Sequence, residues 1–301
     1  MSTSIEVQGV ETVPESQRNG KPSSIISVFV GSNLSLSVMV FGWLSILYGL
    51  SWWQAVTSIL VGTAVASAFV SYSSLLGWRA ATNNSVASGA FFGVKGRLVA
   101  SFVGLLLCIQ YVALTIWTGG ETLASGWARL TDSKGGDRSI ALGYLIIAIS
   151  IVLFALLGYR WIIKLNSWVA PLMGILVVLS VIALWSNFDS NYAGDPELYA
   201  LGTMWPTWLL AALTCGAAGP ISYVTQTGDW SRYISESTTT EKELVRTTFI
   251  AMFFGLSVPT IFGAFVAVAA FDENSFANGF VTQSPGWLLL PLLLIGLIGS
   301  L

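Results

Sequence analysis

Long runs without a charged residue are the feature that most limits how this chain can fold. Seven runs contain no Asp, Glu, Lys or Arg: residues 22–78, 98–120, 139–159, 165–188, 198–228, 247–271 and 274–301. A transmembrane helix needs about 20 mostly apolar residues, so the first run is long enough for two crossings. Because only 9% of the residues are charged, a water-soluble globular domain is excluded.

These runs predict an all-α integral membrane protein with seven complete spans and a partial eighth. The turn-forming stretch Tyr48 to Ser51 divides the first run into two spans. The runs lack the alternation of a transmembrane β-barrel. Trp287 to Leu301 is too short to cross a ~30 Å hydrocarbon core at about 1.5 Å per residue, so we expect a fragment of a longer protein.

The basic residues predict the orientation in the membrane. Residues 1–22 are polar and have no apolar core, which is typical of a cytoplasmic tail rather than a signal peptide. If this tail is cytoplasmic, most of the 13 basic residues lie inside: Arg18, Lys21, Arg79, Lys95, Arg97, Arg160, Lys164, Arg232, Lys242 and Arg246. Only Arg129, Lys134 and Arg138 lie outside, as the positive-inside rule requires.

Composition also limits the partners. A net charge of −2 offers no basic surface for nucleic acid, so we expect no nucleic-acid partner. The expected surroundings of the chain are the lipid bilayer. Cys108 and Cys215 are far apart, and each lies inside an apolar run. We therefore expect no disulfide framework, no zinc site and no cofactor, and no metal other than a coupling cation.

Two predicted spans contain residues that interrupt a helix. In span 6, the stretch Thr214 to Pro220 includes two glycines, and Pro220 removes a main-chain donor. In span 1, Gly31 to Ser37 is a run of small and polar residues. Transporters break two helices near the middle of the membrane, where free main-chain groups hold substrate and ion. The alternative is close helix packing or a simple kink, because glycine and proline are frequent in membrane helices.

The two interruptions lie at the same predicted depth. Gly31 follows Lys21 by ten residues and Gly219 precedes Asp229 by ten, so both lie roughly 15 Å into the membrane. The chain approaches them in opposite directions, which indicates an inverted repeat of spans 1–5 and 6–10. The predicted organisation is a cytoplasmic tail (1–22), a first five-helix repeat (23–187), an external loop (188–204) and an incomplete second repeat (205–301).

The predicted spans carry no ionisable residue deep in the membrane. Glu121 and Asp229 come nearest, at predicted helix ends, and Glu121 is interpreted as solvated or capping. A proton pump or an intramembrane hydrolase is therefore disfavoured. The remaining hydroxyls, amides, carbonyls and aromatic rings suit a small, neutral, planar solute and an alkali cation. Tyr111 and Thr115 are four residues apart and share a helix face, although such pairs often serve packing alone.

Three motifs carry a family resemblance. They are the tail VPESQRNG (13–20), the sequence FGVKGR (92–97) and the sequence GDWSR (228–232), all on the predicted cytoplasmic side. In this order they resemble the purine and cytosine permease family of nucleobase-cation symporters, and the similarity runs the whole length of the chain. The resemblance implies a leucine-transporter-like fold of two inverted five-helix repeats. It also implies inward transport of cytosine, purines, uracil, allantoin, hydantoins or vitamins, driven by sodium or protons.

The resemblance also implies site residues. It places substrate contacts at Tyr111, Thr115, Gly219, Pro220 and Ser222, where Pro220 replaces an aromatic residue of the family. It places the cation near Ser32, Ser35 and Leu36. The family's span 8 supplies the rest of both sites and is expected to be missing, so we expect these residues alone not to catalyse coupled uptake.

The leading hypothesis is a secondary active permease of the plasma or inner membrane that imports a nucleobase-like solute by cation symport. One alternative is a transporter of the same fold for allantoin, a hydantoin, a vitamin or an amino acid. Others are an inactive or structural fragment and, less favoured, a membrane-embedded enzyme. The absence of histidine and of buried acids favours sodium over protons.

Overall fold

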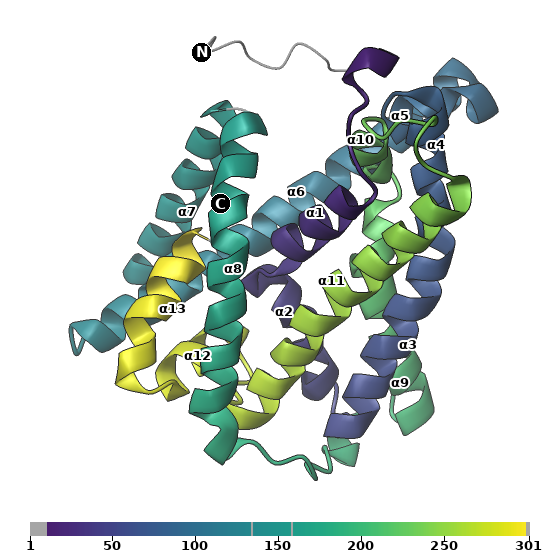
Figure 1. Ribbon diagram of the computed structural model, residues 1–301. Helices are drawn as coiled ribbons and strands as arrows, with labels where there is room; N and C mark the ends of the chain where they lie inside the picture. Colours follow the sequence, from purple (N-terminus) through teal and green to yellow (C-terminus); the bar gives the residue numbers. More distant parts are fainter. Residues whose placement is uncertain (1–10, 134, 158, 299–301) are drawn as a thin grey trace. The chain divides into compact units, whose positions relative to one another are not determined.

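The computed structural model describes residues 11–133, 135–157 and 159–298, without the side chains of residues 154, 157, 159–167 and 295–298. This part of the chain is helical, and its only strand-like pairings are isolated bridges of Asn19 and Gly20 with Ile234. The α-helices (Figure 1) are α1 (Ser23–Asn33), α2 (Leu36–Leu47), α3 (Trp52–Val70), α4 (Ser74–Ala80), α5 (Asn84–Ala87), α6 (Gly89–Leu130), α7 (Asp137–Leu157), α8 (Tyr159–Leu184), α9 (Met204–Ala218), α10 (Thr227–Ser231), α11 (Glu241–Ala269), α12 (Phe276–Gln283) and α13 (Gly286–Ile298).

Short 3-10 helices complete the secondary structure. They are η1 (Glu15–Gln17), η2 (Ser71–Ser73), η3 (Trp185–Asn187), η4 (Pro196–Leu198) and η5 (Pro220–Tyr223). The predicted all-α class is therefore confirmed. Several residues used to predict the topology lie outside the described part of the chain: the first ten of the tail, Lys134, Leu301, and the side chains of Arg160 and Lys164.

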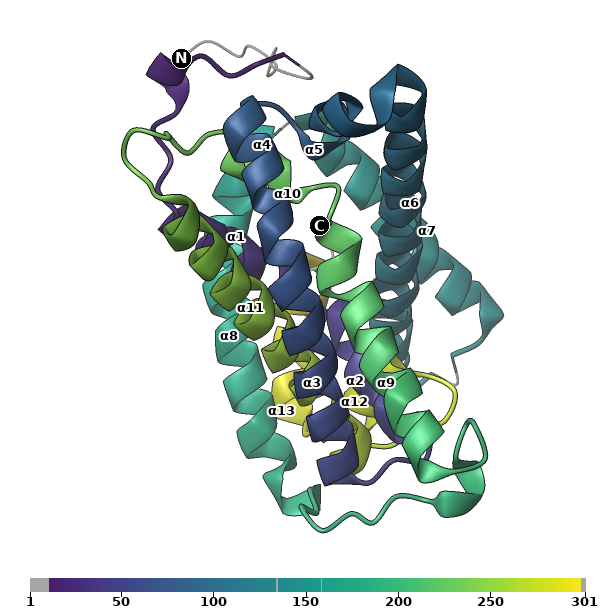
Figure 2. The ribbon, with the colours of Figure 1, turned by 90° about the vertical axis from the view of Figure 1, so that its right-hand side faces the viewer.

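Four helical segments are long and apolar enough to cross a membrane: Trp52–Ala80, Gly89–Leu130, Trp168–Asn187 and Glu241–Ala269. The bent pair α1 and α2 passes the same test if it counts as one span, which gives up to five among the described residues. The predicted count of seven spans and a partial eighth stays a prediction. Figure 2 shows α6 as one long rod, which bends near its start because Gly93 has a φ of 68°.

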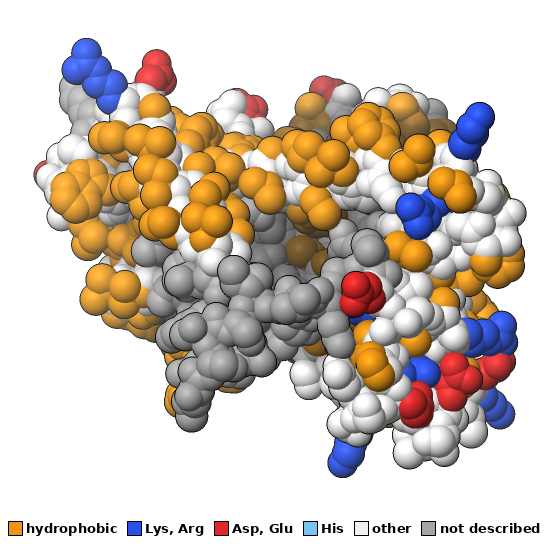
Figure 3. Space-filling model, turned by 90° about the horizontal axis from the view of Figure 1, so that it is seen from above, with side chains coloured by type: hydrophobic (Ala, Val, Ile, Leu, Met, Phe, Trp, Pro, Cys, Tyr) orange, Lys and Arg blue, Asp and Glu red, His pale blue; other side chains and the backbone are white. Residues whose placement is uncertain are grey.

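The surface has the composition expected of a membrane protein. Hydrophobic side chains spread over much of the upper and left-hand surface seen in Figure 3, whereas most of the charged side chains lie in its right-hand half. Along α6, large hydrophobic side chains such as Phe102, Leu105 and Ile109 are exposed. Lipid chains can cover such side chains, whereas water would not.

Contacts divide the chain into two compact units, which are described separately. Unit 1 contains residues 1–30, 63–110 and 216–256, and unit 2 contains residues 31–62, 111–215 and 257–301.

In unit 2, α2 and α11 cross at glycines. A Cβ atom on Gly42 would collide with the main-chain oxygen of Thr260, and one on Gly263 would collide with that of Met39. Small residues at such crossings let helix backbones approach closely. The predicted turn between the first two spans is also present, since α2 ends at Leu47 and Gly49 has a φ of 87°.

In unit 1, the short helices α4 and α10 pack tightly. A Cβ atom on Gly77 would collide with the main chain of Gly228, and the Ser231 hydroxyl donates to the carbonyl of Ser74 at 2.7 Å. The buried Asn84 amide joins the same contact by donating to the Ser73 carbonyl at 3.1 Å and the Thr227 hydroxyl at 2.6 Å. These bonds tie the ends of two predicted spans into one body.

Candidate functional site

The predicted interruption in span 1 is a break in the helix. The helix α1 ends at Asn33 and α2 begins at Leu36, and the two are bent by 68°. Ser35 between them is extended, with φ −127° and ψ 152°. Serine and asparagine side chains compete for main-chain hydrogen bonds and so favour leaving the helix at this position.

Neutral oxygen atoms gather at this break. The hydroxyls of Ser35 and Ser37 lie 2.9 Å apart, and the Asn33 amide donates to the Ser32 hydroxyl at 3.4 Å. Asn33, Leu36 and Ser37 are buried. Hydroxyl and carbonyl oxygens are ligands that hard cations prefer. The three predicted cation residues, Ser32, Ser35 and Leu36, therefore lie together at a polar break in the chain.

The predicted interruption in span 6 is also present. The helix α9 ends at Ala218, and Gly219 leaves the helical conformation with φ −85° and ψ −112° before η5 begins at Pro220. The buried Ser222 hydroxyl lies within hydrogen-bonding distance of the carbonyls of Gly219 (2.7 Å) and Ala218 (3.1 Å). Pro220 has no main-chain N–H, so the helix loses a hydrogen-bond donor at this position. The Ser222 hydroxyl partly replaces the lost donors by bonding these two carbonyls.

The predicted ring and hydroxyl of span 3 lie on an uninterrupted stretch of α6. Tyr111 and Thr115 are both half-buried, and their spacing places them on one face of this helix. They belong to unit 2 with the residues of the first break, whereas Gly219, Pro220 and Ser222 belong to unit 1. The structure thus shows three local groups of predicted site residues, and their assembly into one site stays a prediction.

Glu121 differs from its predicted role. It is neither a cap nor a terminal residue, because α6 continues for nine residues to Leu130. Its carboxylate accepts hydrogen bonds from Trp117 Nε1 (2.8 Å), from the Tyr144 hydroxyl (3.3 Å) and from the Ser275 hydroxyl. The charge-free run ended at Gly120 and was mistaken for the end of the helix. The spacing of Trp117 and Glu121 by four residues was the available signal for this bond.

The family-like motifs explain much of unit 1. Trp230 of the motif GDWSR stacks edge-on against Phe29 of α1, with ring centroids 5.1 Å apart, and Phe29 packs equally closely on Tyr223. Burial raises the pKa of Asp229 in the same motif, and the neighbouring Arg232 partly offsets this effect. The motif therefore joins the first predicted span to the segment after the break in span 6.

Arg18 of the tail motif binds the same region. Its side chain is only 6% exposed and donates to the carbonyls of Trp78 (2.5 Å), Ile234 (2.7 Å) and Arg232 (3.1 Å). It also pairs with Glu15 at 3.0 Å. A guanidinium has five donors, which is why one arginine can satisfy carbonyls from two segments.

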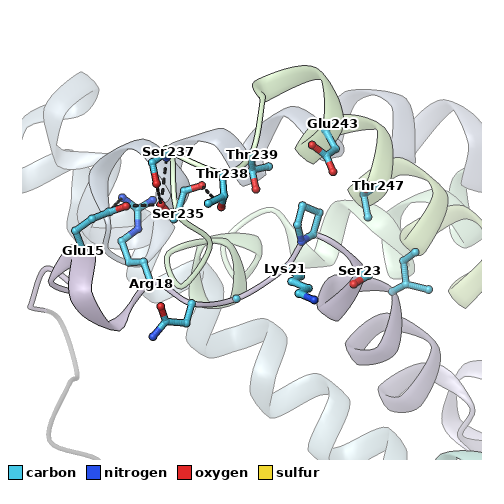
Figure 4. A pocket seen from close by; sticks show the side chains of 14 residues that line it. Glu15, Arg18, Lys21, Ser23, Ser235, Ser237, Thr238, Thr239, Glu243 and Thr247 are labelled. Atoms are coloured by element: carbon cyan, nitrogen blue, oxygen red, sulfur yellow. Dashed lines mark hydrogen bonds and ion pairs between the residues drawn. The ribbon is translucent and has the colours of Figure 1, made fainter.

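A cavity of about 720 Å³ lies beside this tail in unit 1. Figure 4 shows its lining of hydroxyl groups from residues 235–239 together with charged side chains of both signs, Glu15, Arg18, Lys21 and Glu243. None of the eight predicted site residues lines it, so it is distinct from the predicted substrate contacts.

The fold matches solved transporters. The chain superposes with a TM-score of 0.74 on Mhp1, described as a nucleobase-cation-symport-1 family transporter in a closed conformation with bromovinylhydantoin bound, at 16% identity over 99% of this chain and 66% of that one. The inward-facing conformation of Mhp1 gives a TM-score of 0.72 at 16% identity, over 98% of this chain and 66% of that one. This part of the chain, with its two broken helices, therefore has the leucine-transporter-like fold.

The chain belongs to the family of permeases for cytosine/purines, uracil, thiamine and allantoin, whose model matches residues 12–301. This is a family of permeases rather than of enzymes. A putative purine-cytosine permease of Bacillus subtilis, YxlA, is 24% identical over an alignment of 312 positions, which covers 99% of this chain and 62% of the relative. An uncharacterized permease of Schizosaccharomyces pombe is 22% identical over 283 positions, covering 87% of this chain and 46% of that protein.

Proposed function

We propose that the protein containing this chain imports a nucleobase-like solute, such as cytosine or a purine, by symport with a cation. The breaks at residues 34–35 and at Gly219 support this proposal, because the main-chain N–H and C=O groups at a break are not all used in helical hydrogen bonds. Such groups can bind a substrate or an ion. Alternating access follows if substrate and cation together stabilise closure at these breaks. The chain spans 62% and 46% of the two curated relatives, so the activity belongs to the whole protein.

The substrate contacts are assigned to two helices. Tyr111 supplies a ring on which a flat solute stacks, and Thr115 supplies a hydroxyl one turn away. The second side of the proposed substrate site is formed by Gly219, Pro220 and Ser222. Glycine has no side chain, so the substrate can come close to its main chain, and Pro220 offers an apolar surface. The names of two similar proteins support this class of substrate: one is a putative purine-cytosine permease, and the other is described with bromovinylhydantoin bound.

The cation is assigned to the break in span 1. Ser32, Ser35 and Leu36 offer hydroxyl and carbonyl oxygens there, without a charged side chain in the stretch Gly31 to Ser37. An uncharged set of oxygens suits sodium, which needs no acidic group to be carried. The predicted direction of transport is inward, with the tail in the cytoplasm.

The test is uptake of radiolabelled cytosine, hypoxanthine and uracil by cells that express the whole protein from its own gene. Saturable uptake in sodium medium, and its loss when choline replaces sodium, are the expected results. Tyr111→Ala should abolish uptake, whereas Tyr111→Phe keeps the ring and should retain it. Tyr72→Ala is the matched control, because Tyr72 is 64% exposed. Uptake of none of the three nucleobases by a correctly inserted protein would contradict the proposal.

A second candidate is a permease of the same fold for another solute. The family description includes allantoin and thiamine beside the nucleobases. Competition separates the two: excess unlabelled cytosine or hypoxanthine should inhibit a nucleobase carrier, whereas allantoin, a hydantoin, thiamine or leucine should be the better inhibitor of the alternatives.

A further inference from the structure

A groove of about 550 Å³ lies in unit 1 between the end of α3 and the start of α11. Figures 1 and 2 show these two helices side by side. Ala68 and Leu75 line the groove from the segment that joins α3 to α4, and Lys242, Arg246 and Phe249 line it from α11. None of the proposed substrate or cation residues lines this groove, so the transport site does not account for it.

Two cations at the start of α11 lack an acidic partner. Lys242 and Arg246 are exposed and lie four residues apart, so they share one face of the helix. Among the residues that the structure describes, neither forms an ion pair. Glu241 also lines the groove, but its carboxylate is already paired with Arg79 at 2.6 Å. Like charges at this spacing repel each other, so a bound anion between them would be stabilising.

The surface becomes apolar along both helices away from these charges. On α11, Phe249 and Phe253 follow Arg246 by about 5 and 11 Å along the axis, and their rings are parallel with centroids 6.0 Å apart. On α3, Val65 and Phe69 are 53% and 76% exposed. The groove therefore has basic groups at one end and exposed hydrocarbon surface leading away from it.

This order of charge and hydrocarbon matches a phospholipid. Basic pockets between membrane helices on the cytoplasmic side can hold acidic lipid headgroups. We propose that the groove binds one anionic phospholipid of the leaflet predicted to be cytoplasmic. Lys242 and Arg246 hold the headgroup phosphate, and an acyl chain lies along Val65 and Phe249. The proposal does not depend on which solute the protein transports.

The headgroup decides which lipid binds. Lipid tails are as apolar as the side chains they would contact, so an acyl chain gains no hydrophobic free energy by leaving the bilayer for the groove. The acyl part of the groove orients the lipid and accepts any phospholipid of similar chain length. The two basic residues distinguish an anionic headgroup from a zwitterionic one, because the guanidinium of Arg246 can donate two parallel hydrogen bonds to a phosphate and Lys242 adds a second positive charge.

The first test measures lipid binding to the purified whole protein by native mass spectrometry. Dioleoyl phosphatidylglycerol and dioleoyl phosphatidylcholine have the same acyl chains and differ in headgroup charge. Each basic residue near an anionic headgroup strengthens binding about fivefold, so phosphatidylglycerol should bind about 25-fold more tightly. Lys242→Gln together with Arg246→Gln should remove this preference and leave the affinity for phosphatidylcholine unchanged, which also shows that the variant is folded.

Two controls accompany this measurement. Lys21→Gln together with Lys95→Gln removes the same charge from exposed residues outside the groove, so the preference should remain. Glycerophosphoglycerol has the headgroup of phosphatidylglycerol without its acyl chains, and it should not compete with the lipid.

The second test locates the lipid in a bilayer. Val65→Cys is labelled with bimane after Cys108→Ser has removed the exposed native thiol, whereas Cys215 is buried and stays. Phosphatidylglycerol with brominated acyl chains should quench the bimane more strongly than equally brominated phosphatidylcholine. Val99→Cys on α6, which is 65% exposed, is the matched control and should be quenched equally by both lipids. Adding Lys242→Gln and Arg246→Gln should abolish the difference at position 65.

Each contrary outcome overturns the proposal in a different way. Equal affinity for the two lipids would show that the groove meets only the general lipid coat. A preference that survives the loss of Lys242 and Arg246 would place the headgroup elsewhere. Competition by glycerophosphoglycerol would mean that a soluble phosphodiester binds instead of a lipid. Quenching at position 65 by neither lipid would show that another segment of the protein covers the groove.

Discussion

The guanidinium of Arg18 donates a hydrogen bond of 2.7 Å to the carbonyl of Ile234, 216 residues further along the chain. The same side chain bonds the carbonyls of Trp78 and Arg232. Residues of the tail, of α4 and of the segment after α10 therefore meet at one buried cation. In a chain with few charges, this arginine organises the predicted cytoplasmic side of unit 1.

Arg18→Ala should destabilise the protein by about 3 kcal/mol, because it leaves three buried carbonyls without their donor. Thermal unfolding of purified protein in detergent measures the change. Arg79→Ala is the matched control: Arg79 is 59% exposed and pairs with Glu241 at the surface, so its removal should cost less than about 1 kcal/mol. Equal losses in both variants would contradict the role of the buried bonds.

Gly263→Ala should destabilise by about 1–3 kcal/mol, because the added Cβ meets the main-chain oxygen of Met39, and backbone cannot move aside as a side chain does. Gly174→Ala on α8 is the control. No atom lies within 4 Å of a Cβ there, so we expect a gain of about 0.5–1 kcal/mol from lower backbone entropy in the unfolded chain. The two unfolding midpoints should move in opposite directions.

Asp229→Asn should stabilise the protein at neutral pH. Burial raises the pKa of this carboxyl in the folded state, so the folded protein binds its proton more tightly than the unfolded chain does. Stability from this group is present in acid and is lost as the pH rises through the folded pKa. The variant's advantage in melting temperature should therefore shrink on acidification. A constant difference across pH would show that ionisation is not the cause.

Thr115→Val should raise the apparent KM for the transported solute about fivefold, the effect of losing one hydrogen bond of about 1 kcal/mol. Valine keeps the shape of threonine, so the fold should be unaffected. Thr131→Val, at the exposed end of α6, should leave uptake unchanged. If both variants transport like the parent protein, Thr115 does not contact the substrate.

Much of the architecture follows from local physics. Charge-free runs predicted the helical membrane class, and small residues with one proline predicted breaks that the structure places at Leu34–Ser35 and at Gly219. Both are properties of short stretches of chain. The family resemblance then identified the fold and the permease class, which the comparisons confirm.

Contacts between residues that are far apart in the sequence could not be predicted. A charge-free run marks where lipid can surround a helix and does not mark where the helix ends. For this reason α6 starts before the predicted span and continues past Glu121, whose charge is tolerated because three neighbours donate to it. Likewise, the last span was predicted to begin at Trp287, close to the start of α13 at Gly286, but the run 274–301 gave no sign that the residues before it form the separate helix α12. Ser275 caps α12 and also bonds Glu121, which lies 154 residues earlier, so its full role could not be predicted from the neighbouring sequence.

The anchoring of the tail by Arg18 has an evolutionary consequence. Its partners at positions 78, 232 and 234 are carbonyl oxygens, and every amino acid carries one. Mutations that change the side chains there can accumulate without breaking the bonds, provided that the backbone keeps its course. Among diverged homologues, the arginine should persist while the residues it holds drift freely, so covariation between them would be weak even though they touch.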